Sequence, residues 1–259
     1  MKRFDSKLIV LDLDGTLLRN DKTVSKENID ALLNFKAKGN KILFATARPP
    51  RDAYKYVPVP LRDNPIICYN GACIINKDKE IIYSKQIERK DVINTLYVFK
   101  KHGYNNLCLE IDDRLYSNFD TTDYFGAAPT TIVNLEELHF EKAYKVLVCS
   151  RDPVIFKDIL GELPKNVKGI ITDFGSLCQV MNSQVNKWTS IKVFLDEFGI
   201  NKEDSIAFGD DHNDIEMLKN CGIGVAMKNA EDAVKEIADV VTSSNVDDGI
   251  AKYINNNLI

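Results

Sequence analysis

Two aspartates follow a strongly apolar run near the start of the chain. The run covers residues 8–11, and Asp12 and Asp14 come directly after it. Such a run predicts a strand buried on both faces, and the alternation of side chains directs both carboxylates to the same side. Burying a charge without a partner is costly. The two carboxylates therefore require a proton, a cation or hydrogen-bond donors close by.

Further polar residues follow two other predicted strands. The strand predicted over 41–47 delivers Thr46 near its end, and the strand predicted over 205–211 ends in a run of acidic residues. The carboxyl ends of parallel strands meet at one edge of an open α/β sheet, where ligands bind. We therefore expect as many as five carboxylates near one crevice, those of Asp12, Asp14, Asp210, Asp211 and Asp214.

A cluster of carboxylates is unfavourable unless protons or a cation offset its charge. Two carboxylates about 4 Å apart repel by roughly 4 kcal/mol at an effective dielectric constant of 20. No histidine or cysteine is placed to favour zinc. A few carboxylates with room for water and phosphate oxygens suit Mg²⁺ better than Ca²⁺. The pattern therefore predicts a Mg²⁺ site.

The elements that carry these residues alternate between strand and helix. This alternation predicts parallel strands covered by helices. Between them lies a stretch in which hairpins mix with helices, including a predicted helix over 152–163, and this mixture is typical of an α+β module. We predict an α/β fold, with a Rossmann-like parallel core domain over 1–81 and 184–259 and an inserted α+β domain over 82–183.

Composition excludes several function classes. The 259 residues are 44% hydrophobic and carry a net charge of −4, without the clustered positive charge that nucleic-acid binding needs. No apolar run approaches the ~18 residues of a membrane span. The six cysteines are scattered without a C-x-x-C pair, so we expect buried, reduced thiols and a cytoplasmic location.

Four motifs in chain order resemble those of the haloacid dehalogenase-like superfamily. They are DLDGT at 12–16, Thr46, Lys187 and GDDHND at 209–214. The longer stretch GDDHNDIEMLKNCGIGVAMKNA looks like the Cof-type phosphatases of that superfamily, and NGA at 70–72 fits the same subfamily. The resemblance covers the whole chain. It implies that the inserted domain is a cap whose face selects the leaving group.

The resemblance also implies roles for the central residues. Asp12 is the nucleophile that forms an aspartyl-phosphate. Asp14 is the general acid and then the base, with a raised pKa. Thr46 and Lys187 act in catalysis by holding the transferring phosphoryl oxygens. Mg²⁺ is bound by Asp12, Asp210 and the backbone carbonyl of Asp14.

A wider set surrounds these residues in the same resemblance. Asp214 orients Lys187 or metal-bound water, and Asp211 stands beside it in a supporting position. The phosphate-binding set contains Gly15, Thr46, Ala47, Arg48, Lys187 and Asn213. Two positions depart from the family pattern, because Ala47 and Trp188 stand where glycine is usual. Both add bulk near the mouth of the site, so a borrowed substrate assignment does not follow.

We expect a Mg²⁺-dependent phosphomonoesterase that acts on a small phosphorylated metabolite. Sugar phosphates are the leading class by analogy of fold, and flavin mononucleotide and pyridoxal phosphate stay open. One alternative is a phosphomutase that uses the same aspartyl-phosphate. Another is a non-catalytic phosphoacceptor or sugar-phosphate sensor, against which Asp14 argues, because a long-lived phosphoaspartate needs no acid or base partner. The missing membrane spans exclude a transport ATPase.

Overall fold

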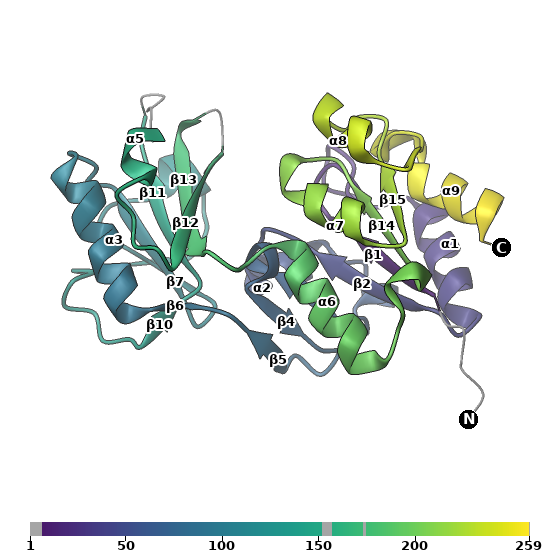
Figure 1. Cartoon of the computed structure of the whole chain (residues 1–259), viewed down its shortest axis with the longest axis horizontal. Coiled ribbons are helices and arrows are strands. Elements are labelled where there is room, and N and C mark those ends of the chain that lie inside the picture. The colour runs from purple at the N-terminus through teal and green to yellow at the C-terminus, as the bar shows by residue number, and fades with distance from the viewer. Residues whose placement is uncertain (1–6, 152–156, 173–174, 259) are drawn as a thin grey trace. The chain divides into compact units, whose positions relative to one another are not determined.

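The chain divides into two units in the computed structural model, which describes residues 7–151, 157–172 and 175–258 (Figure 1). One unit is Met1–Ser84 with Asn186–Ile259, and the other is Lys85–Val185. The predicted boundary at residue 82 cuts through a strand, β5 (Ile81–Ser84), that pairs with its neighbour in the first unit's sheet. For this reason the first unit extends to Ser84.

The first unit contains an eight-stranded sheet in the order β16-β15-β14-β1-β2-β3-β4-β5. The strands from β16 to β3 are parallel, and β4 and β5 are antiparallel additions at one edge. The apolar runs that predicted buried parallel strands form its centre. The strands are β1 (Leu8–Leu11), β2 (Lys41–Ala45), β3 (Ile66–Cys68), β4 (Cys73–Ile75), β5, β14 (Ser205–Gly209), β15 (Ile223–Ala226) and β16 (Val240–Val241).

Helices cover both faces of this sheet. On one face, Leu8 and Val10 share a core with Ile191 and Met217 of two helices. On the other face, Phe208 meets Tyr253 edge-on, with ring centroids 5.3 Å apart. The first pair of helices is α6 (Lys187–Phe198) and α7 (Ile215–Asn220), and the second is α1 (Lys26–Ala37) and α9 (Gly249–Asn257), which contact each other. Two shorter helices are α2 (Pro50–Tyr56) and α8 (Asp232–Ile237).

Local signals place the ends of these helices. The Ser25 side chain accepts a hydrogen bond from the backbone N–H of Asn28 and caps α1. Gly199 ends α6 in the left-handed region. The largely apolar segment 64–72 predicts a strand, and this prediction is wrong in its second half. There β3 ends at Cys68, and residues 69–71 form a 3₁₀ turn.

The second unit is an α+β domain. Its main sheet has the order β12-β13-β11-β7-β8-β9, and all pairs are antiparallel except β8 with β9. Helix α3 (Arg89–Lys101) packs its apolar side against β7, β11 and β13. The strands are β6 (Ile87–Glu88), β7 (Leu107–Ile111), β8 (Arg114–Ser117), β9 (Thr130–Ile132), β10 (Lys142–Ala143), β11 (Lys145–Cys149), β12 (Val167–Thr172) and β13 (Leu177–Asn182).

The remaining helices of this unit are short. They are α4 (Thr122–Phe125) and α5 (Lys157–Leu160). Of the helix predicted over 152–163, residues 152–156 lie outside the described residues. The predicted α/β fold class is confirmed, and the role of this unit as a cap stays a prediction.

Two expectations from composition concern the whole chain. Among the described residues, no helix is both long and apolar enough to cross a membrane. All six cysteines are buried, as we expected for thiols packed in strands.

Candidate active site

The candidate site lies where β1 sits between β14 and β2. The chain moves outward from β1 through β2 and β3 on one side, and returns through β14 on the other. This reversal is the position at which an open α/β sheet forms a crevice at its carboxyl edge. Asp12 follows β1, Thr46 follows β2 and Asp210 follows β14. The backbone N–H of Asp12 donates to the carbonyl of Phe208, so the β1–β14 register extends into the site.

A buried ammonium group joins two carboxylates at the centre. The Nζ of Lys187 lies 2.6 Å from Oδ1 of Asp12 and 2.6 Å from Oδ1 of Asp214. The side chains of Lys187 and Asp214 are fully buried, and that of Asp12 is 8% exposed. Lys187 is the first residue of α6, and the Asn186 cap that begins this helix therefore determines where the ammonium group lies.

Burial and charge shift the protonation of this cluster. Burial, together with the carboxylates of Asp214 and Asp210, raises the pKa of Asp12 although Lys187 opposes the change. Burial alone would lower the pKa of Lys187, but its two carboxylate partners outweigh burial and raise it. Burial raises the pKa of Asp210 to about 7, against the effect of a hydrogen bond from Thr16. Asp12 and Asp210 therefore hold protons more tightly than free carboxylates do.

Three of these carboxylates can face one ion. Asp12, Asp210 and Asp214 each offer an oxygen, and the three oxygens lie within 4.8 Å of one another. An all-oxygen set suits a hard divalent cation, which would replace the protons that Asp12 and Asp210 hold. The residues present therefore fit a metal ion.

The Asp14 carboxylate is paired with two cationic side chains. Arg48 donates from Nε to Oδ2 at 2.6 Å and from Nη2 to Oδ1 at 2.8 Å, and Lys22 donates to Oδ1 at 2.8 Å. Burial would raise the pKa of Asp14, but these two cations outweigh burial and lower it. The predicted rise in the pKa of Asp14 is therefore wrong. Arg48 itself is fixed by Asp52 and by the ring of Tyr56.

Sequence reasoning did not find Lys22. It lies in the loop after the first motif with a left-handed φ of 65°, and no periodic pattern connects it with Asp14. A turn composition of Asn-Asp-Lys-Thr is the only local signal for this conformation.

Gly15 allows the first loop to approach the second. It has a φ of +81°, and a Cβ atom there would lie 2.1 Å from Oδ2 of Asp210. The next residue, Thr16, donates from Oγ1 to Asp210 at 2.6 Å. Asn229, which the sequence did not single out, donates to the carbonyl of Gly15 at 2.8 Å. The aspartate that follows β14 is therefore held by the loop that follows β1.

The second acidic loop is organised by Asp214. Its Oδ2 accepts from the backbone N–H groups of Asp210 at 2.9 Å and Asp211 at 3.1 Å, while Oδ1 accepts from Lys187. Asp211 is exposed and accepts from the backbone of His212, so it lies outside the buried cluster. Asn213 donates from Nδ2 to Oδ1 of Asn70 at 3.1 Å.

The other predicted residues occupy the neighbouring loop and helix. Thr46 is buried, and its Oγ1 accepts from the backbone of Arg48 at 3.2 Å. Ala47 is half-buried between them. Trp188 packs against the hydrophobic core under α6. The structure thus brings the predicted residues together at one sheet edge, with Asp211 outside the buried cluster and the Asp14 carboxylate paired with Arg48 and Lys22.

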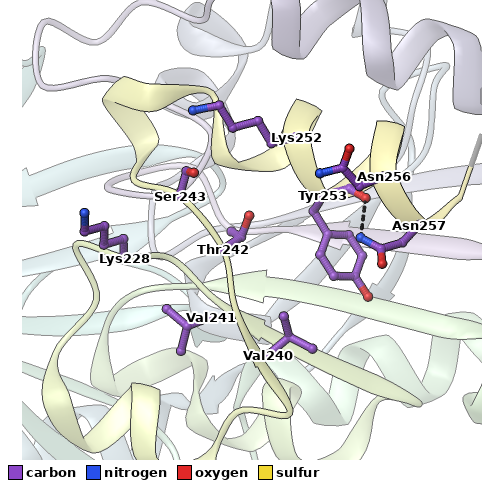
Figure 2. A pocket seen from close by; sticks show the side chains of 9 residues that line it. All are labelled: Lys228, Val240, Val241, Thr242, Ser243, Lys252, Tyr253, Asn256 and Asn257. Atoms are coloured by element: carbon purple, nitrogen blue, oxygen red, sulfur yellow. Dashed lines mark hydrogen bonds between the residues drawn. The ribbon is translucent and has the colours of Figure 1, made fainter.

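A separate cavity of about 410 Å³ lies elsewhere in the first unit (Figure 2). It is formed by β16, the loop that follows it and α9, and Figure 2 shows Lys228 and Lys252 among its lining residues. None of the predicted site residues lines this cavity. Its position by the edge strand separates it from the carboxyl edge of β1.

Comparison with known proteins finds relatives over nearly the whole chain. A family model described as haloacid dehalogenase-like hydrolase matches residues 9–254. The 5-amino-6-(5-phospho-D-ribitylamino)uracil phosphatase YitU of Bacillus subtilis is 30% identical over 95% of this chain and 96% of its own. The pyridoxal phosphate phosphatase YbhA of Escherichia coli is 27% identical over 98% and 99% of the two chains. The solved sugar phosphatase BT4131 has a TM-score of 0.81 and 27% identity, covering 97% and 98%.

Proposed function

This chain belongs to the haloacid dehalogenase-like hydrolases, and from that membership we propose that it is a Mg²⁺-dependent phosphomonoesterase with Asp12 as nucleophile. The resemblance to the Cof-type phosphatases, predicted from the motifs, is confirmed by these relatives. The proposal covers the roles of individual residues, the metal and the substrate class. It includes the cytoplasmic location that we predicted from the sequence.

One observation carries the proposal. A buried carboxylate follows the central strand, with an ammonium group 2.6 Å away that is itself held by a second buried carboxylate. Buried ion pairs are poor stabilisers compared with apolar side chains of similar size. Their presence at the carboxyl edge of a sheet therefore supports a chemical role rather than a structural one.

In the first half of the reaction, a carboxylate oxygen of Asp12 attacks phosphorus in line. The new bond between Asp12 and phosphorus forms as the bond to the leaving oxygen breaks, and Asp14 gives its proton to that oxygen. Asp14 is paired with Arg48, a proposed phosphate ligand. A phosphate that engages Arg48 would draw the guanidinium from Asp14 and allow the carboxyl group to take up a proton.

In the second half, water attacks the phosphorus of the aspartyl-phosphate and Asp14 accepts the proton of that water. The bond to Asp12 breaks, and inorganic phosphate leaves. Lys187, Thr46 and Asn213 supply positive charge and hydrogen-bond donors to the phosphoryl oxygens in both halves. Asp214 holds Lys187 in place through its 2.6 Å contact.

Mg²⁺ would be held by Asp12, Asp210 and the backbone carbonyl of Asp14, with Asp214 close by. When bound, it would neutralise the clustered carboxylates and reduce their repulsion of an anionic substrate. Two observations indicate that these residues fit a divalent ion. Carboxylate oxygens of Asp12, Asp210 and Asp214 lie within 4.8 Å of one another, and the pKa of Asp210 is raised to about 7.

The substrate class that we propose is a small phosphorylated metabolite, with sugar phosphates first. Support comes from the activities of YitU, YbhA and BT4131, whose substrates share a phosphate on a small organic group. We propose that the inserted unit, Lys85–Val185, determines which leaving groups the enzyme accepts.

The test is phosphate release from a panel of sugar phosphates, pyridoxal phosphate and a ribitylaminouracil phosphate, with Mg²⁺ and with EDTA. We expect metal-dependent release that is lost in Asp12→Asn, with the fold retained by circular dichroism. Equal release by the wild type and Asp12→Asn would sink the proposal. Isomerised substrate without free phosphate would point to a mutase instead.

A further inference from the structure

We propose that the buried turn Tyr69–Asn70–Gly71 positions the phosphate-binding groups, with Asn70 as its central positioning residue. The inference rests on the proposed function, because it assigns Asn70 to the same site. Sequence reasoning singled out Asn70 only as part of a motif, and the reaction proposed above does not use it.

The turn is held in an unfavourable backbone conformation. Three consecutive residues have positive φ values, 53° at Tyr69, 58° at Asn70 and 106° at Gly71. Two of them carry side chains, and both are buried. Such conformations cost free energy and persist only where the surrounding structure holds them, most often at functional sites. The contacts of this turn therefore indicate what it holds in place.

The first contact is with the loop after β2. The backbone N–H of Asn70 donates to the carbonyl of Thr46 at 2.9 Å, and that of Tyr69 donates to the carbonyl of Arg48 at 3.0 Å. These two donors hold the ends of the segment 46–48, which contains the proposed phosphate ligands. The left-handed backbone turns both N–H groups toward that segment, and an extended strand would not.

The second contact is with the acidic loop after β14. The side chains of Asn70 and Asn213 meet at 3.1 Å, and the buried Oδ1 of Asn213 has no hydrogen-bond partner in the described part of the chain. A carboxamide can rotate by 180°. If both side-chain amides are rotated in this way, Nδ2 of Asn70 donates to Oδ1 of Asn213. The Nδ2 group of Asn213 then occupies the buried position that had no hydrogen-bond partner, and it is available as an N–H donor. A phosphate oxygen is the acceptor that such a donor requires.

The third contact is with the start of α6. Ser190 donates from Oγ to the carbonyl of Gly71 at 2.5 Å. A Cβ atom on Gly71 would lie 2.1 Å from the carbonyl oxygen of Asn186, the residue before Lys187. The turn thus contacts each of the three elements that carry Thr46, Lys187 and Asn213, which explains why it is retained despite its strain.

The decisive variant is Asn70→Gly. Glycine adopts a φ of 58° without strain, so relief of strain offsets part of the stability that is lost with the buried side chain and its contact with Asn213. We expect kcat/KM for phosphate release to fall about tenfold or more, as for other residues that orient a reacting group. Asn213→Ala should fall similarly, and the double variant should lose little more than the worse single variant. The matched control is Lys79→Gly, at an exposed turn with a φ of 65°.

Three outcomes would overturn the inference. They are an Asn70→Gly enzyme within twofold of the wild type, fully multiplicative losses in the double variant, and an equal loss in Lys79→Gly. A binding readout separates this inference from the proposed function. Inorganic phosphate with MgCl₂ should raise the Tm of the wild type and Lys79→Gly, and should raise it less in Asn70→Gly. If the wild type hydrolyses nothing but shows this difference, hydrolysis fails as the function and the positioning role stands.

Discussion

Replacing Asp210 by asparagine should stabilise the metal-free protein while it abolishes the proposed activity. Burial and neighbouring carboxylates raise the pKa of Asp210 from the usual 3.8 to about 7. The folded chain therefore holds this proton more tightly than the unfolded chain does. The resulting cost to stability is absent below about pH 4, grows between pH 4 and 7, and is fully present above pH 7.

The size of the effect follows from two separate arguments. A pKa difference of this size corresponds to roughly 4 kcal/mol at pH 8 and roughly 2 kcal/mol at pH 5. Coulomb's law gives a similar value, since two carboxylate oxygens that lie within 4.8 Å of each other repel by at least about 3.5 kcal/mol at an effective dielectric constant of 20. The carboxamide oxygen of the Asp210→Asn variant would still accept the hydrogen bond that Thr16 donates at 2.6 Å. The substitution therefore removes charge with little loss of contact.

The assay is urea unfolding in EDTA at pH 8 and pH 5, repeated with Mg²⁺. We expect Asp210→Asn to raise the free energy of unfolding by roughly 2 to 4 kcal/mol at pH 8 and by roughly 1 to 2 kcal/mol at pH 5. Mg²⁺ should stabilise the wild type and hardly affect the variant. Asp232→Asn, on a side chain that is 95% exposed, controls for the change in net charge. A variant less stable than the wild type in EDTA at pH 8, or an equal gain at both pH values, would refute the reasoning.

Three further predictions concern the same cluster. Lys187→Met leaves two buried carboxylates without their ammonium partner. It should lower the free energy of unfolding in urea by about 3–5 kcal/mol at pH 7, and by less at pH 5. A variant as stable as the wild type at pH 7 would contradict this prediction. Gly15→Ala combines a φ of +81° with a Cβ atom 2.1 Å from Asp210. It should lower the free energy of unfolding by about 2 kcal/mol more than Gly39→Ala does, because Gly39 has a similar φ of +86° but no atom within 4 Å of the added Cβ. Equal losses in the two variants would show that the clash at Gly15 is relieved. Calorimetric titration should show Mg²⁺ affinity falling about tenfold per pH unit below pH 7 with release of protons, since protonated Asp210 competes with the metal; an unchanged affinity at pH 6 and 8 would argue against these ligands.

Some parts of the site were predictable because they depend on local pattern. The apolar run before Asp12 and the similar run before Asp210 are both buried strands of one parallel sheet. Asn186 and Gly199 bracket α6, and Ser25 caps α1, as their residue types indicate. Each of these signals concerns residues a few positions apart, where backbone geometry translates sequence directly into position.

Other parts were not predictable because they depend on which loops meet. Asp14 forms salt bridges with Lys22 and Arg48. These cations lower the pKa of Asp14, which we had predicted to be raised. Asn70 meets Asn213 across 143 positions of the chain. The predicted end of the first unit missed β5. The Lys-Asp-Lys turn at 77–79 indicates a hairpin of two short strands, but no local signal shows that this hairpin joins the first unit's sheet through β3.

The amino-acid sequence alone therefore specifies the fold class, the motifs, and the sheet edge at which Asp12, Thr46 and Asp210 emerge. These follow from apolar periodicity and strand direction, which are local properties. The partner of each charged group emerges only when the strands are ordered and the helices packed. The Lys187 ammonium reaches Asp12 from 175 positions away, across the crevice between two strand ends. Its pKa and those of its neighbours depend on burial and on distances of a few ångströms, which only the packed chain establishes.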